Sequence, residues 1–157
     1  MAPWEKESTR IHWIAYIRGI IFHVGIFTAL TVLAISPWLE FIPDWVQWAA
    51  MVITGVGAVA AFGGIWLRLS EANLRILSLP DDYFSVLVTG LFISFAFLIL
   101  VIPSLMPVFY LISVFMFLYI PFSKIRHCVY FFYSKFFFGL SFGHRGSIGQ
   151  KPGQYAE

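Results

Sequence analysis

The sequence predicts an all-α integral membrane protein, a four-helix bundle with both termini in the cytoplasm. Only 11% of the 157 residues are charged and 60% are hydrophobic, with a mean hydropathy of +0.84, whereas a soluble globular domain has about 25% charged residues. Four apolar stretches are long enough to cross a bilayer, which takes about 20 residues each. The basic residues lie in segments that share one side of these stretches, which predicts the orientation.

The expected elements follow from where these apolar stretches begin and end. We expect helices at about 14–35, 45–67, 83–102 and 108–127, separated by proline-containing or charged connectors. The first stretch is too long for the apolar region of a signal peptide, so it is interpreted as a retained span. An aromatic extension of the fourth helix completes a transmembrane domain over 1–138, and 139–157 forms a polar C-terminal tail.

All ten lysines and arginines lie towards the N-terminus, in the connector between the second and third spans, or in the C-terminal segment. They are Lys6, Arg10, Arg18, Arg68, Arg75, Lys124, Arg126, Lys135, Arg145 and Lys151. The other two loops carry only Glu40 and Asp44 or no charge at all. An excess of cations marks cytoplasmic segments, so the pattern predicts cytoplasmic termini. The expected location is the inner (cytoplasmic) membrane, crossed several times.

Cys128 is the only cysteine, which limits what the chain can do alone. It excludes an intrachain disulfide, and an iron–sulfur cluster or cysteine-rich zinc site held by this chain by itself. The sequence also offers no nucleotide-binding loop and no catalytic carboxylate pair. We therefore expect a non-catalytic subunit that works with a partner.

The second predicted span is rich in small residues, which let helix backbones approach closely in lipid. They are Gly55, Gly57, Ala58, Ala60, Ala61, Gly63 and Gly64. We expect a helix-packing face here, in preference to a face that contacts a flat macrocycle.

Two histidines, His23 and His127, lie in apolar segments near opposite ends of the chain. An imidazole in hydrocarbon is costly unless its ring nitrogens are satisfied, so such residues are functional candidates. The topology directs both toward the cytoplasmic side, and one imidazole from each of two neighbouring helices is the ligand set of a b-type haem. The alternative is that each bonds a neighbouring helix. His12 and His144 lie in polar flanks, where a solvated histidine is expected.

The surroundings of the two histidines suit a haem. Gly19 lies four residues before His23, on the same helical face, where a missing side chain leaves room for the porphyrin edge. Arg18, Lys124 and Arg126 lie near the predicted cytoplasmic boundary, where they could pair with haem propionates. Taken singly, each could equally be an ordinary flanking charge of a membrane span.

The segments around both histidines resemble motifs of a known family. Residues 20–26 (IIFHVGI) and 120–127 (IPFSKIRH) resemble elements of the b-haem gamma subunit of respiratory nitrate reductase. Related sequences occur in membrane cytochrome b subunits of heterodisulfide-reductase-type and sulfite-reduction-associated complexes. The resemblance implies an electron-transfer subunit between a membrane quinone pool, menaquinone or ubiquinone, and a cytoplasmic iron–sulfur partner subunit of a respiratory oxidoreductase complex.

The resemblance also implies one haem where the gamma subunit has two. The other two ligand positions of that family correspond here to Leu33 and Phe109, so the outer haem lacks both ligands while His23 and His127 form the inner pair. The family's quinol site lies beside the missing haem and is not carried over. A quinone could bind near the inner haem or in another subunit. His12, Trp13 and Tyr16 could line such a site, although an aromatic belt is the favoured interpretation.

Two other classes of function compete with electron transfer. The main alternative is a haem-free structural membrane anchor of a multisubunit complex, in which the histidines are hydrogen-bonded packing residues. A small transporter subunit that moves protons through His23 is less favoured, because no intramembrane carboxylate offers a relay partner.

Overall fold

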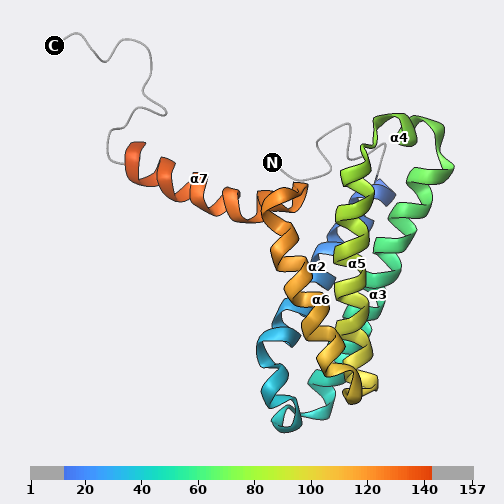
Figure 1. Cartoon of the computed structure of the whole chain (residues 1–157), viewed down its shortest axis with the longest axis vertical. Helices are drawn as coiled ribbons and strands as arrows, with labels where there is room; N and C mark the ends of the chain where they lie inside the picture. Colours follow the sequence, from blue (N-terminus) through green and yellow to red (C-terminus); the bar gives the residue numbers. More distant parts are fainter. Residues whose placement is uncertain (1–12, 143–157) are drawn as a thin grey trace. The chain divides into compact units, whose positions relative to one another are not determined.

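The computed structural model describes residues 13–142, and all regular elements in that part of the chain are helical. The α-helices are α2 (Trp13–Ile35), α3 (Asp44–Ser70), α4 (Ala72–Leu77), α5 (Pro80–Val101), α6 (Met106–Tyr119) and α7 (His127–Phe142). Figure 1 shows α2, α3, α5 and α6 running alongside one another. The predicted all-α class is confirmed.

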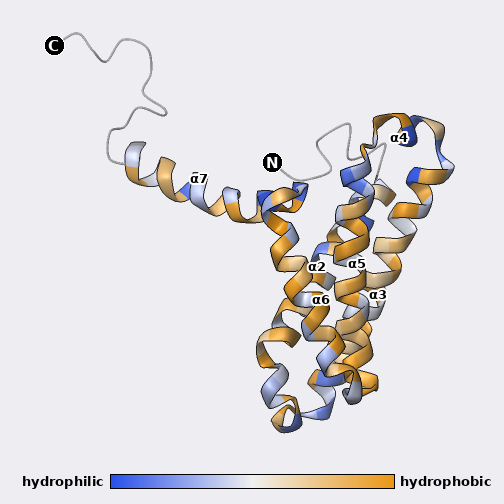
Figure 2. Cartoon of the chain, viewed as in Figure 1, coloured by the Kyte–Doolittle hydropathy of each residue, from blue (hydrophilic) through white to orange (hydrophobic). Residues whose placement is uncertain are grey.

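Within residues 13–142, four helical stretches are long and apolar enough to cross a membrane. They are Trp13–Phe41, Asp44–Ser70, Pro80–Val101 and Pro103–Phe122. Figure 2 shows apolar residues along the length of these helices and hydrophilic residues gathered toward their ends. The prediction of a multi-pass membrane protein with four spans is therefore confirmed.

The chain divides into two compact units, Met1–Tyr119 and Ile120–Glu157, and each is described by itself. In the first unit α5 is the central helix, because it packs against α2, α3 and α6, while α2 also packs along α3. Its Phe92 and Ile93 are fully buried, and the Phe109 ring of α6 stacks on Phe92 at 5.5 Å between centroids. Stacked aromatic pairs of this kind add to the free energy gained by burial alone.

Small residues allow α2 and α3 to touch. A Cβ added to Gly25 would lie 2.8 Å from the Cα of Gly57, a separation that real side chains do not tolerate. Elsewhere on α3, Gly55 lies against the Phe97 ring of α5, and Ala61 lies against Gly90 of α5. The predicted packing face of the second span is thus observed, as expected where close backbone approach stabilises helices in lipid.

The fourth helix ends earlier than the sequence indicated. The sequence predicts a helix over about 108–127 with Pro121 inside it, but α6 ends at Tyr119 and the apolar stretch at Phe122. Pro121 provides the reason, because it lacks an N–H group and its ring collides with the preceding turn. Ser123 then adopts an extended conformation (φ −110°, ψ 173°), which ends the helical path.

The second unit begins with two short 3₁₀ turns, at Ile120–Phe122 and Lys124–Arg126, and continues as α7. His127 is therefore the first residue of α7 and does not close the fourth span. Helix α7 continues to Phe142, so the boundary expected at residue 139 falls inside a helix. The rest of the predicted tail lies outside the described residues.

Candidate functional site

His23 is exposed on α2, and one of its ring nitrogens is already engaged. Its Nδ1 lies 2.7 Å from the carbonyl oxygen of Gly19, one turn earlier on the helix. A carbonyl oxygen can only accept, so Nδ1 is the donor and a neutral ring keeps its lone pair on Nε2. Within the described part of the chain, no hydrogen bond reaches that Nε2 atom.

His127 repeats this arrangement at the start of α7. Its Nδ1 donates to the carbonyl oxygen of Lys124 at 2.5 Å, and its side chain is also exposed. Histidines that bind metals usually donate the other ring N–H to a carbonyl or carboxylate group, which sets the tautomer and the ring orientation. Both predicted ligands therefore present an Nε2 lone pair that could coordinate a metal.

The donor set suits a haem better than a metal ion held by side chains alone. Among residues 13–142, no group of three or more His, Cys, Asp or Glu side chains could hold a metal ion. A haem needs fewer protein ligands, because the porphyrin supplies four nitrogens and the chain adds only axial groups. The imidazoles of His23 and His127 are side chains of that kind.

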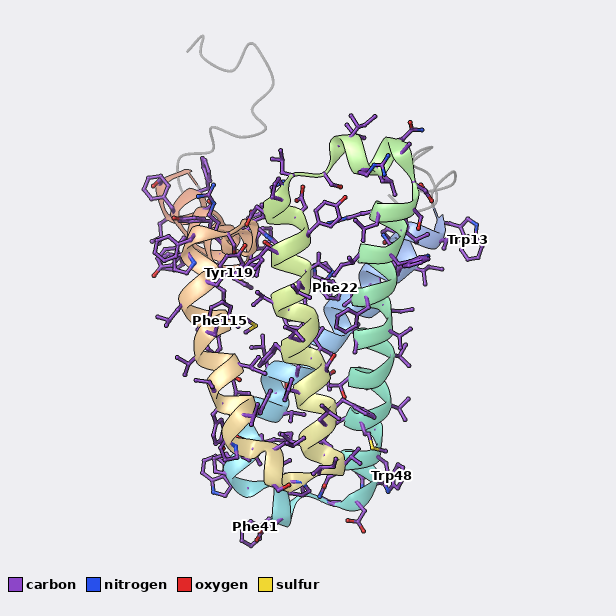
Figure 3. All side chains as sticks on the ribbon, turned by 45° about the vertical axis from the view of Figure 1, so that its right-hand side comes forward. Trp13, Phe22, Phe41, Trp48, Phe115 and Tyr119 are labelled. Carbon is purple, nitrogen blue, oxygen red and sulfur yellow. The ribbon has the colours of Figure 1, made fainter. Side chains whose placement is uncertain are left out.

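A pocket of about 300 Å³ adjoins His23 between α2 and α3, with one residue from α5. It is lined by Ala15, Arg18, Gly19, Phe22, His23, Ala60, Ala61, Gly64, Arg68 and Val86. Phe22, which lines this pocket, is labelled in Figure 3 between the ribbons of α3 and α5 and shows where the pocket lies in the bundle. The predicted site residues Arg18, Gly19 and His23 thus come together at one pocket.

Two glycines shape this pocket. A Cβ added to Gly19 would meet no atom within 4 Å, so the helix surface is open at this position. A Cβ added to Gly64 would lie 3.7 Å from Nε of Arg18. The Arg18 side chain therefore lies against α3 at Gly64, at a distance that a Cβ would also tolerate.

Sequence reasoning missed Arg68, which lines the same pocket from the last turn of α3. Its Nη1 donates to the main-chain carbonyl of Asp82 at 3.2 Å, which holds the guanidinium at the end of the helix. A signal was available in the sequence. Consecutive spans are antiparallel, so the start of the first and the end of the second lie at the same end of the bundle, and each carries one arginine.

The other predicted site residues lie in the second unit. Ser123, which is 2% exposed, accepts a hydrogen bond through Oγ from the Ile125 N–H at 3.1 Å and so caps the turn. This turn carries Lys124 and Arg126, both exposed, directly before His127. The predicted cations and the histidine of residues 121–127 (the PFSKIRH motif) thus lie next to one another, in this turn and at the start of α7.

The positions that correspond to the second haem of the resembled family are packed with hydrocarbon. Phe109 is 0% exposed and stacks on Phe92, and Leu33 packs against the same core cluster. Tight packing of this kind leaves few gaps wider than a water molecule.

Trp13 and Tyr16 are exposed at the start of α2, and the pocket beside His23 includes neither. This position suits aromatic side chains at a membrane–water interface. His12 and His144 lie outside the described residues.

No family model, curated protein or solved structure matches the chain in comparisons with known proteins.

Proposed function

We propose that this protein is the b-haem membrane subunit of a respiratory oxidoreductase complex in the inner (cytoplasmic) membrane. It carries electrons between the quinone pool and a cytoplasmic iron–sulfur partner subunit. The observation that carries the proposal is that His23 and His127 make the same hydrogen bond. In each residue the Nδ1–H group donates to a main-chain carbonyl oxygen, and Nε2 is left open.

In this proposal the chain binds and orients one haem b, which supplies one-electron redox chemistry when bound. The Nε2 atoms of His23 and His127 would hold the haem iron. Arg18, Lys124 and Arg126 pair with the propionates, since guanidinium and ammonium groups form strong charge-assisted hydrogen bonds with carboxylates. Gly19 leaves space at the porphyrin edge.

The packed core supports a single haem. Leu33 and Phe109 belong to the apolar cluster around α5, so a second macrocycle at their level would have to displace buried side chains. Removal of a large buried side chain costs about 3–5 kcal/mol. We therefore propose that only the haem on the cytoplasmic side is retained, and that the quinone site differs from that of the two-haem relatives.

The proposed iron–sulfur partner subunit is inferred from the single cysteine and from the distribution of basic residues. A single cysteine cannot hold an iron–sulfur cluster, so a second protein has to supply one. The basic segments share the side assigned to the cytoplasm by the positive-inside rule, and a soluble subunit would dock there. The resemblance of residues 20–26 and 120–127 to the nitrate reductase gamma subunit points to the same arrangement.

Optical spectroscopy on the complex purified from membranes tests the proposal. The dithionite-reduced protein should show a b-type absorption band, and His23→Ala or His127→Ala should abolish it. His12→Ala and His144→Ala are matched controls that should leave it intact. A wild-type complex that assembles without haem would favour the structural anchor, and a band retained in either ligand variant would contradict the axial assignment.

A further inference from the structure

The pocket beside His23 brings together two guanidinium groups from different helices. Arg18 comes from the first turns of α2 and Arg68 from the last turn of α3, and both are partly buried. Each lies at the end of a membrane span. The sequence alone places these residues fifty positions apart, and only the packing of α2 on α3 joins them.

Among residues 13–142, neither guanidinium has a carboxylate partner. Within the described residues, Arg68 donates a hydrogen bond to the main-chain carbonyl of Asp82, and Arg18 forms no ion pair. Arginine carries five N–H donors, so most of this donor capacity remains available. Two partly buried cations that line one pocket repel one another, and an anion bound in that pocket would relieve the cost.

We propose that Arg68 joins Arg18 in binding the haem propionates, and that the haem lies against the α2–α3 face of the bundle. This inference rests on the proposed function, and it adds Arg68 and helix α3 to a site assigned so far to α2 and the PFSKIRH motif. Both residues are positioning residues, because they hold the carboxylates and leave the iron to the histidines.

The arrangement of the pocket matches a haem in three respects. Arg18 lies five residues before His23, which is ~7.5 Å along the helix toward its end. The two propionates leave the same edge of the macrocycle, and two cations that line one pocket together with an imidazole suit that geometry. The remaining lining is mostly small or apolar, so a flat hydrophobic ring can approach both helices.

An anionic phospholipid offers the same headgroup chemistry, since a phosphate also takes bidentate hydrogen bonds from arginine. It would leave Nε2 of His23 unused, however. The imidazole within the pocket therefore favours a propionate over a phosphate, and the experiment below separates the two.

The test uses the purified complex and the variants Arg18→Gln, Arg68→Gln and Arg68→Lys. We expect haem to dissociate about tenfold faster from Arg68→Gln, the factor expected when one charge-assisted hydrogen bond is lost. The haem midpoint potential should fall, because loss of a nearby positive charge disfavours the reduced state. Arg68→Lys keeps the charge, so it should preserve the potential while it loses the bidentate contact.

Arg75→Gln is the matched control, because Arg75 is exposed on α4 and is absent from the pocket lining. If Arg68→Gln equals this control in both haem dissociation and potential, the inference is wrong while the proposed function stands. Native mass spectrometry that detects a bound phospholipid in the wild type, lost in Arg68→Gln with haem unchanged, would also overturn it in favour of a lipid. A wild-type complex with no haem would overturn the proposed function and this inference together.

Discussion

Gly25 of α2 and Gly57 of α3 pack backbone against backbone, so that a Cβ on Gly25 would lie 2.8 Å from the Gly57 Cα. This contact sets how closely the two helices approach one another. The pocket that holds Arg18, His23 and Arg68 lies between the same two helices. The geometry of the candidate site therefore depends on this contact.

Gly57→Ala should destabilise the first unit, because the new methyl group cannot fit without separating α2 from α3. Overpacking of this kind costs about 1–3 kcal/mol, and thermal unfolding in detergent would measure it. Gly63→Ala is the matched control on the same helix, where an added Cβ meets nothing within 4 Å. A similar melting temperature for Gly57→Ala and the wild type would show that the helices do not touch here.

Gly19→Phe should block haem binding without unfolding the protein. A Cβ at Gly19 meets no atom within 4 Å, and a ring attached to it would occupy the room proposed for the porphyrin edge. We expect loss of the reduced b-type band with little change in melting temperature. In a haem-free anchor the same substitution would change neither property, so the pair of measurements also separates the two candidate functions.

Phe109→Ala should cost about 3–5 kcal/mol, the range for removal of a fully buried phenylalanine. The ring is 0% exposed and stacks on Phe92. Phe117→Ala on the same helix is the control, since that ring is 48% exposed and should give only a small change. Equal losses of stability would contradict the assignment of Phe109 to the core.

Tyr119→Phe should weaken the junction between α5 and α6. The Tyr119 hydroxyl donates to Oδ1 of Asp81 at 2.6 Å, and its ring packs edge-on against Phe84. Phenylalanine keeps the ring contact and removes the hydroxyl, so the expected loss is about 1.5–3 kcal/mol, as for a hydrogen bond to a charged group. Tyr133→Phe, on exposed α7, serves as the control for chemical denaturation.

Much of the fold follows from local sequence. The four spans were predictable because length and hydropathy alone decide whether a segment can cross a bilayer. The packing role of Gly57 was predictable because small residues on an apolar helix serve close contact. The break after Tyr119 was missed, although Pro121 signalled it, because prolines within membrane helices often cause only a kink.

The candidate site was predicted in two local parts. Gly19 beside His23 follows from helical periodicity, since residues four apart share a face. Lys124 and Arg126 beside His127 follow from adjacency in the chain. Arg68 could not be assigned in this way, because its proximity to Arg18 depends on the rotation and register of two helices.

The sequence by itself therefore determined that this is a four-span helical membrane protein with two histidines in apolar surroundings, since these features depend on composition and local spacing. Only the tertiary structure decided which side chains share the pocket at His23, and that Gly25 meets Gly57. Contacts between helices are set by how their surfaces interlock, and no single segment carries that information.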